Sequence, residues 1–257
     1  MLDADAQLQD DLLERLLPYA LEGGWSAVQL RKAVIDPDRN WLTRSQAMEM
    51  ALDAVIQSGR LANGGVAELR GNGQLIKRSV LESSGGFNED TVTDDLDLSF
   101  RLLTHGALVG ILWDPPVQEE AVPTLAALWK QRQRWAEGGL QRFFDYWPTL
   151  TSSQLTVRQR WDLACFFLLQ YGLPVVSFAD LSTSLVTRTA PSYWPLSFVA
   201  FSVSGLAYWR GCRISSEGPP IPSAGPLQLL LAIFLSLIHI SEPTRRTPIS
   251  YAVFCLK

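Results

Sequence analysis

The spacing of apolar residues changes near residue 150, and this change divides the chain into two parts. Up to Leu150, helical and extended patterns alternate, as in "LQDDLLERLLPYALEGG" followed by "WSAVQL". From Trp161 onward, long apolar runs dominate. Alternating helices and strands favour an α/β layer architecture, whereas apolar runs of about 20 residues are typical of membrane helices. We therefore predict an α/β domain over residues 1–150 and a membrane region over residues 151–234.

Periodicity and turn residues place the individual elements of the first part. Gly23 and Gly24 end the first helix, and a short strand follows them. Glycines also interrupt an expected strand over 66–78, where the backbone turns or comes close to a ligand. The remaining expected elements are a helix over 41–61, a helix from Thr93, a buried strand over 107–113, and a helix over 124–147 that weakens at Gly138 and Gly139.

Two apolar runs of the second part, 163–178 and 193–209, have close to the length that crosses a bilayer. A third run opens at Pro226 and breaks off at Phe234, as a cut membrane helix would. Buried core helices are the alternative interpretation of each run. Pairs of arginines precede the first run and follow the second, and only Arg188 lies between them, so the positive-inside rule predicts a cytoplasmic N-terminal side. We predict a multi-pass protein of a bacterial plasma membrane, with its catalytic part in the cytoplasm.

The last stretch, "LSLIHISEPTRRTPISYAVFCLK" over residues 235–257, resembles translated sequencing adapter. Back-translation of its two halves allows two adapter sequences in frame and in order. We therefore leave the stretch out of the fold prediction, the alternative being a polar turn before a short strand. The whole sequence has a net charge of −4, and removing the stretch makes the balance more acidic. An acidic chain gives no support to a nucleic-acid partner.

Asp3 and Asp5 lie two residues apart at the start of the chain, in "LDADAQ". Paired carboxylates at the carboxyl end of a strand can hold a hard divalent cation that also bridges phosphate oxygens. An ordinary acidic turn is the alternative. These two residues are therefore candidate metal ligands.

A second acidic group, in "TVTDDLDLSF", falls where a helix is expected to begin. Thr93 can cap that helix, and its first turn carries Asp94, Asp95 and Asp97. A helix N-terminus stabilises negative charge, which would keep a carboxylate ionised and available as a general base. The alternative is ordinary capping, although capping needs only one acceptor.

In "KQRQRW", the residues Gln131, Arg134 and Trp135 are spaced to share one helix face. That face offers an amide, a guanidinium that can hold a phosphate, and a ring on which a sugar can stack. The alternative is a set of surface cations at a membrane interface, and we assign Lys130 and Arg132 to that role.

The order of these motifs resembles the processive, membrane-integrated family 2 glycosyltransferases, the group that contains cellulose, chitin and hyaluronan synthases. The resemblance is close over residues 1–150 and loose in the membrane region. It implies a GT-A-like catalytic domain with a mixed α/β sheet, followed by transmembrane helices. It also implies a nucleotide-sugar donor, with a UDP-sugar as the expected one, together with a glycan acceptor and the lipid bilayer as partners.

The resemblance assigns a role to each motif. Asp3 and Asp5 match the D-x-D motif, which implies Mg²⁺ or Mn²⁺ and the donor diphosphate. Asp95 matches the last residue of T-E-D, which implies the base that deprotonates the acceptor, and Asp94 stands where the family has Glu. "RGNG" is a loose match to a small-residue loop of the site. The match to Q-x-x-R-W implies diphosphate and acceptor contacts by Gln131, Arg134 and Trp135.

The family's sheet begins well before D-x-D, with strands and an acidic residue that bind uridine, whereas Met1 stands directly before the motif. We therefore expect that the N-terminal part of the domain is missing. A fragment without those strands would leave sheet edges and apolar faces uncovered, so we predict that this polypeptide alone is unstable and inactive.

The motifs together predict an inverting, membrane-bound glycosyltransferase that adds sugars to a growing polysaccharide. Two alternatives stay open. One is a non-processive family 2 enzyme that adds a single sugar to a lipid or a short glycan. The other is a non-catalytic membrane-surface module that binds through Lys130, Arg132 and Arg134.

Overall fold

The computed structural model describes residues 1–88, 90–150 and 154–214. The expected third membrane run at 226–234 and the adapter-like stretch at 235–257 lie outside the described residues.

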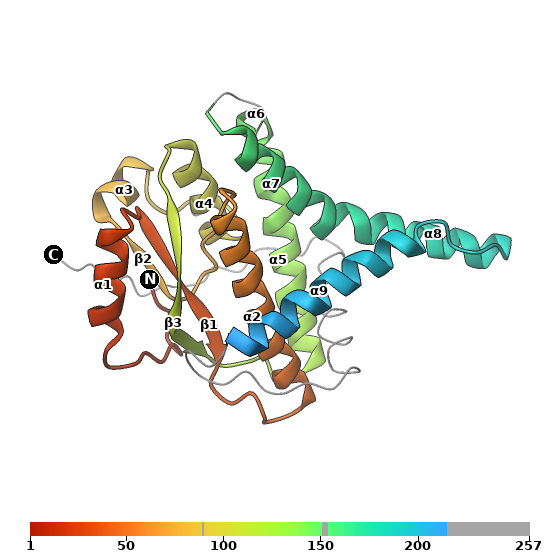
Figure 1. The fold of residues 1–257 in the computed structure, drawn as a ribbon, viewed down its shortest axis with the longest axis horizontal. Helices are drawn as coiled ribbons and strands as arrows, with labels where there is room; N and C mark the ends of the chain where they lie inside the picture. The colour runs from red at the N-terminus through yellow and green to blue at the C-terminus, as the bar shows by residue number, and fades with distance from the viewer. Residues whose placement is uncertain (89, 151–153, 215–257) are drawn as a thin grey trace.

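A mixed three-stranded sheet forms the centre of the domain, in the order β2-β1-β3 (Figure 1). The strands are β1 Ala27–Val34, β2 Gln74–Ile76 and β3 Val109–Glu119. β1 pairs with β2 in the antiparallel sense and with β3 in the parallel sense. The predicted mixed α/β sheet is therefore confirmed. Since β1 and β3 are parallel, their carboxyl ends meet at one edge, which is where open α/β sheets bind ligands.

Helices cover both faces of this sheet (Figure 1). On one face, Leu12 and Leu16 of α1 Leu12–Glu22 pack with Val28 and Leu30. On the other face, Leu98 and Leu102 of α4 Asp94–Thr104 pack with Ala27 and Val109. Successive side chains of a strand point to opposite faces, so residues 27 and 28 of β1 join different clusters. The result is a layered domain with the sheet in the middle.

The long α2 Trp41–Ala62 matches the helix predicted over 41–61, and Asn40 caps it by accepting the backbone N–H groups of Leu42 and Thr43. The strand expected over 66–78 is shorter than predicted. Only β2 forms, and residues 66–70 pair with no strand of the described chain. Short helices complete the domain as α3 Arg78–Ser83 and α6 Trp147–Leu150.

The helix α5 Leu125–Asp145 continues through Gly138 and Gly139, where the sequence predicted that it weakens. A Cβ at Gly138 would lie 2.1 Å from Thr93 Oγ1, and one at Gly139 would lie 1.9 Å from Tyr171 Oη. These distances are far below van der Waals contact. The glycines therefore let neighbouring segments approach the helix closely.

The first apolar run lies in one continuous helical stretch made of α7 Val157–Phe167, the π-helical η1 Leu168–Gly172 and α8 Leu173–Thr187. Within the described part of the chain, only this stretch, Val157–Thr187, is a helix long and apolar enough to cross a membrane. The second run forms α9 Trp194–Ile214, which returns from α8 toward α2 (Figure 1). One candidate span supports membrane association, and the multi-pass arrangement stays a prediction.

Candidate active site

A large cavity of about 2150 Å³ opens at the carboxyl edge of β1 and β3. It continues between α2 and α5 to the apolar side chains of α8 and α9. All seven site residues expected from the sequence line it, although they come from three distant segments: Asp3, Asp5, Asp94, Asp95, Gln131, Arg134 and Trp135. The structure therefore brings the three motifs to one place.

The D-x-D segment is fixed to the carboxyl edge of the sheet by polar contacts. The Asp3 N–H donates to Asn72 Oδ1 at 3.2 Å, and the Asn72 side-chain amide donates to Glu119 at 3.2 Å. Lys32, near the end of β1, pairs with Glu119 at 2.8 Å. The Asp5 carboxylate accepts the backbone N–H of residue 120 at 3.4 Å. These contacts leave both carboxylates at the cavity wall.

Burial raises the pKa of Asp3, and the neighbouring carboxylates of Glu119, Asp5 and Asp94 raise it further, while Lys32 lowers it. A cation bound among these carboxylates would relieve their repulsion. Among the described residues, no group of three or more His, Cys, Asp or Glu side chains could hold a metal by itself. Two carboxylates do suit Mg²⁺ that takes its other ligands from substrate phosphates and water. The residues present therefore fit a metal bound together with a diphosphate.

The start of α4 departs from the capping that the sequence suggests. Thr93 occupies the N-cap position, but its side chain makes no capping hydrogen bond to the described residues. Asp94 Oδ1 instead accepts the Asp95 N–H at 3.0 Å. Gly71 faces this point of the helix, and a Cβ there would lie 3.7 Å from Asp95 Oδ2.

The pKa of Asp95 is raised to about 6, first by burial and then by the adjacent Asp94. Arg70 and Lys32 lower it, as does a backbone hydrogen bond from Leu96. The helix N-terminus, expected from the sequence to keep this carboxylate ionised, does not bring its pKa down to the ordinary value, because burial and a like charge outweigh it. A pKa near 6 leaves Asp95 ionised at neutral pH and close enough to neutrality to accept a proton in a reaction.

Asp97, the third carboxylate of this turn, lies outside the cavity. It is buried, it pairs with Arg101 at 2.8 Å, and its other oxygen accepts the Tyr146 hydroxyl at 2.8 Å. These contacts attach α4 to the end of α5. Asp97 therefore has a structural role, and the two preceding aspartates face the cavity.

The helix α5 divides its cations by face. Arg134 lines the cavity, whereas Lys130 is exposed to solvent. The assignment of Arg132 to a membrane interface is wrong, because it is 3% exposed and paired with Glu49 of α2. Its guanidinium also stacks 4.5 Å from the centre of the Trp135 ring. Arg132 therefore holds that ring in place at the cavity wall.

Several cavity residues escaped the sequence reasoning. Glu49 and Asp53 of α2 line the cavity, and their spacing of four residues on a helix was a usable signal. Lys32 lines it too, and no pattern around it marks it as a site residue. Arg70 and Asn72 also line the cavity, and they lie in "RGNG", which the sequence marked only as a loose match to a site loop.

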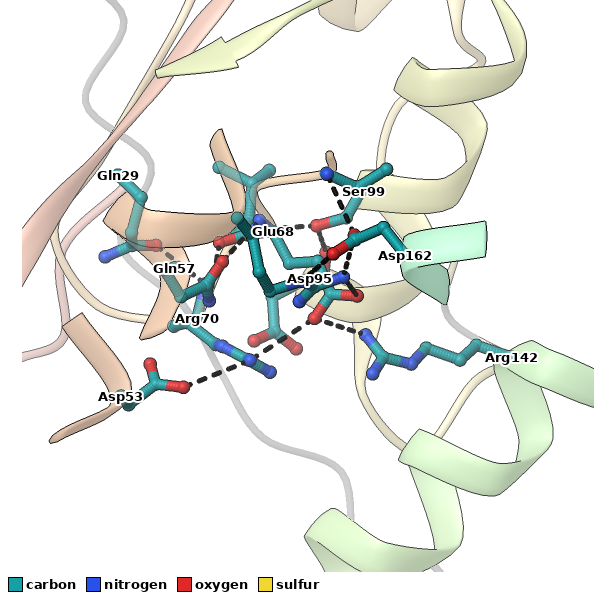
Figure 2. A network of polar contacts seen from close by, with 12 residues as sticks. Gln29, Asp53, Gln57, Glu68, Arg70, Asp95, Ser99, Arg142 and Asp162 are labelled. Carbon is teal, nitrogen blue, oxygen red and sulfur yellow. Dashed lines mark hydrogen bonds and ion pairs between the residues drawn. The ribbon is translucent and has the colours of Figure 1, made fainter. Parts of the chain in front are cut away.

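The extended segment 66–70 lies behind the cavity and reaches its wall with Arg70, and we call this segment the inner wall of the site. Side chains of other elements take the place of a neighbouring strand along it (Figure 2). Four of its backbone N–H groups donate to side chains of other elements, at 2.6 to 3.0 Å. The pairs are Val66 with Asp162, Glu68 with Gln57, Leu69 with Ser99, and Arg70 with Gln29. Buried backbone donors need such partners, so these four side chains fix the wall.

Comparison with known proteins confirms the glycosyltransferase family that the motifs resemble. Residues 1–212 match the sequence model of the family described as "Glycosyl transferase family group 2". Similar curated proteins include three named beta-monoglucosyldiacylglycerol synthase. The one from Synechocystis sp. is 47% identical over 218 residues, covering 84% of this chain and 46% of that protein. Those from Trichormus variabilis and Nostoc sp. are each 41% identical over 238 residues, covering 93% of this chain and 51% of each protein. The chain thus spans about half the length of the curated relatives it matches.

Proposed function

This chain belongs to glycosyl transferase family group 2, and we propose that its protein transfers one glucose from a nucleotide-sugar donor to the hydroxyl of a diacylglycerol. One observation carries the proposal. The cavity that holds the predicted catalytic and donor-binding residues continues, without a break, to apolar side chains of α8 and α9. A lipid acceptor needs this combination, because its hydroxyl must reach the polar end while its acyl chains stay in apolar surroundings.

The apolar end of the cavity adjoins the candidate membrane span Val157–Thr187. Phe178 and Leu181 of α8 line the cavity, as do Phe198 and Val199 of α9, and all four are largely exposed. A contiguous exposed apolar surface of this kind is typical of contact with lipid. An acceptor could therefore pass from the bilayer to the carboxylates along one wall.

In the proposed reaction, Asp95 takes the proton from the acceptor hydroxyl. The hydroxyl oxygen bonds to the anomeric carbon as the bond from that carbon to the diphosphate oxygen breaks, which inverts the configuration. Arg134 and Gln131 would hold the diphosphate, and Trp135 would contact the sugar. The pKa of about 6 for Asp95 suits a base that works at neutral pH.

We further propose that Asp3 and Asp5 bind Mg²⁺ or Mn²⁺ together with the donor, here taken as a UDP-sugar. The cation would neutralise charge on the departing diphosphate. The fit rests on two carboxylates at one cavity wall, with the pKa of Asp3 raised by its acidic neighbours.

The Q-x-x-R-W motif favoured a growing polysaccharide as product. Three relatives are named for a product that carries one glucose on a diacylglycerol, and this favours the non-processive alternative. We therefore propose single transfer to a lipid, at a membrane, for this protein.

The test is reconstitution of the full-length protein in phospholipid vesicles containing diacylglycerol, with UDP-glucose and Mg²⁺. Thin-layer chromatography and mass spectrometry of the lipid fraction should find one hexose per lipid. A series of products with increasing numbers of sugars would instead show that the enzyme is processive. Vesicle binding without turnover of any nucleotide sugar would favour the non-catalytic module. Mixed vesicles without diacylglycerol are the matched control for the acceptor.

A further inference from the structure

Glu68 lies at the centre of a cluster of ion pairs (Figure 2). Its side chain is fully buried, and three guanidinium groups from different segments surround it. Arg142 of α5 lies 3.0 Å from its carboxylate, Arg70 of the inner wall 3.3 Å, and Arg60 of α2 3.8 Å. One acidic residue therefore connects three elements that meet at the active site.

The cluster is balanced in charge. Arg60 also pairs with Asp162 at 2.8 Å, and Arg70 also pairs with Asp53 at 3.2 Å, so three carboxylates face three guanidinium groups. Burial by itself would raise the pKa of Glu68, but the three arginines outweigh it and lower the pKa to about 2. Glu68 thus stays ionised at any pH at which the protein would work.

The helix that leads toward the membrane completes this cluster. Asp162 of α7 accepts three contacts from the Arg60 guanidinium, as well as the backbone N–H of Val66 at 3.0 Å. Phe166 lies one turn further along α7. The centre of its ring is 4.3 Å from the guanidinium carbon of Arg60 and 6.0 Å from that of Arg70. The apolar ring shields the cations from water, which strengthens their ion pairs.

Arg70 links the buried Glu68 to the cavity, which Asp53 and Arg142 of the cluster also line. It lines the cavity wall, and a single nitrogen, Nη2, contacts both Glu68 and Asp53. The next residue, Gly71, lies beside Asp95, whose charge also acts on Arg70. Three carboxylates therefore compete for one guanidinium. The position of Arg70 relative to these carboxylates therefore sets how strongly its positive charge lowers the pKa of Asp95.

We propose that Glu68 is a positioning residue, whose buried carboxylate holds Arg70 at a fixed place beside Asp95 and ties that place to α5 and to the membrane-side helix α7. This inference rests on the proposed function for the role of Asp95. It adds that Glu68, which has no contact with the substrate, controls the activity of Asp95, which acts on the acceptor. Without Glu68, Arg70 would turn toward Asp95 and pair with it directly.

The test uses four variants of the full-length protein in vesicles. Glu68→Gln removes the central charge. Glu68→Gln/Arg142→Met removes one charge of each sign and so avoids an unpaired buried arginine. Arg70→Lys keeps the positive charge but replaces the guanidinium, whose Nη2 contacts both Glu68 and Asp53, with a shorter ammonium group. Glu82→Gln is the matched control, because Glu82 forms an exposed ion pair with Arg78 on α3.

We expect about a ten-fold or larger loss of kcat for the first three variants, with the KM for the nucleotide sugar unchanged. In both Glu68 variants the acidic limb of the pH profile should move to lower pH, because a closer Arg70 favours the ionised form of Asp95. The charges that face this carboxylate are Asp94 on α4, Arg70 on the inner wall and Lys32 on β1, and only Arg70 should move. Glu82→Gln should behave as the wild type.

A folded double variant with wild-type kcat and an unmoved limb would overturn the proposal and leave Glu68 a structural role alone. If neither Glu68 variant folds, Arg70→Lys decides, since unchanged kcat in that variant means that the place of Arg70 does not matter.

Hydrolysis of the nucleotide sugar by water can be measured without lipid, so the variants can be compared whether or not diacylglycerol is the acceptor. Should the protein turn over no nucleotide sugar, the proposed function fails. The titration of Asp95 in protein carrying ¹³C-labelled aspartate carboxyls then still decides, because an identical Asp95 titration in the double variant and the wild type contradicts the proposal.

Discussion

The start of α4 and the inner wall of the site each place a carboxylate beside the same cavity, and burial acts on both in the same direction. At the start of α4, Asp95 has a second carboxylate as its neighbour, and its pKa rises to about 6. In the inner wall, Glu68 has three guanidinium neighbours, and its pKa falls to about 2. Neighbouring charge, and not burial, therefore separates a carboxylate that can exchange a proton from one that cannot.

The start of α4 and the inner wall also differ in how they affect the stability of the fold. Between the ordinary pKa of an aspartate and about 6, the folded protein holds a proton on Asp95 that the unfolded chain releases, so this region loses stability as pH rises through that window. Glu68 contributes stability at neutral pH that is lost as pH falls toward 2. A region that does chemistry is thus destabilising where the supporting region is stabilising.

Asp95→Asn should have the largest effect on activity. The amide cannot take the acceptor proton, so we expect transfer to fall by about 10²- to 10⁴-fold. Initial rates of glycolipid formation in vesicles measure the loss, and Asp10→Asn on the exposed surface is the control for the same chemical change. A variant that keeps more than a tenth of the wild-type rate would show that Asp95 is not the base.

The same two carboxylates should respond oppositely in stability. Glu68→Gln leaves three arginines without their central partner, and we expect the free energy of unfolding to fall by about 3–5 kcal/mol. Asp95→Asn removes a charge that the fold disfavours, so it should leave the free energy of unfolding unchanged or higher at pH 8. Denaturant unfolding of both variants in one detergent measures the difference. Two changes of the same sign and size would contradict the comparison.

Gly138→Ala tests whether close packing of α5 holds the start of α4. The new methyl group would meet the Thr93 side chain, which is β-branched and cannot turn aside easily. We expect a loss of about 1–3 kcal/mol of stability together with reduced transfer. Gly59→Ala on α2 is the matched control, because its Cβ has open space among the described residues, and it should stabilise the helix by about 0.5–1 kcal/mol. Equal effects at the two glycines would remove the packing argument.

The sequence was sufficient to predict the parts of the fold that depend on local pattern. The structure confirms the helix over 41–61, and the buried strand predicted over 107–113 forms as β3, which begins at Val109 and continues to Glu119. The strand over 66–78 was predicted too long, because its amides are satisfied by side chains from four distant elements. Periodicity within a segment carries no information about such partners.

The site could be predicted where a motif marks it, and not where tertiary contacts create it. Asp3, Asp95 and Arg134 belong to motifs and line the cavity as expected. Glu68 belongs to none of the motifs, and its role depends on arginines 60, 70 and 142, which only the fold brings around it. The wrong interface assignment of Arg132 has the same origin, since its partner lies on α2.

Asp94→Asn should have the smallest effect and test the cause of the difference between the two regions. It removes the like charge beside Asp95 and leaves burial in place, so the pKa of Asp95 should fall only part of the way to its ordinary value. The acidic limb of kcat/KM, expected near pH 6 in the wild type, should move to lower pH by less than about one unit. Donor hydrolysis and lipid transfer measured from pH 4.5 to 8, a window of roughly the range in which a carboxylate of this pKa titrates, should give the same limb. An unmoved limb would mean that burial alone raises the pKa of Asp95, and that the charge of its neighbour does not distinguish it from Glu68.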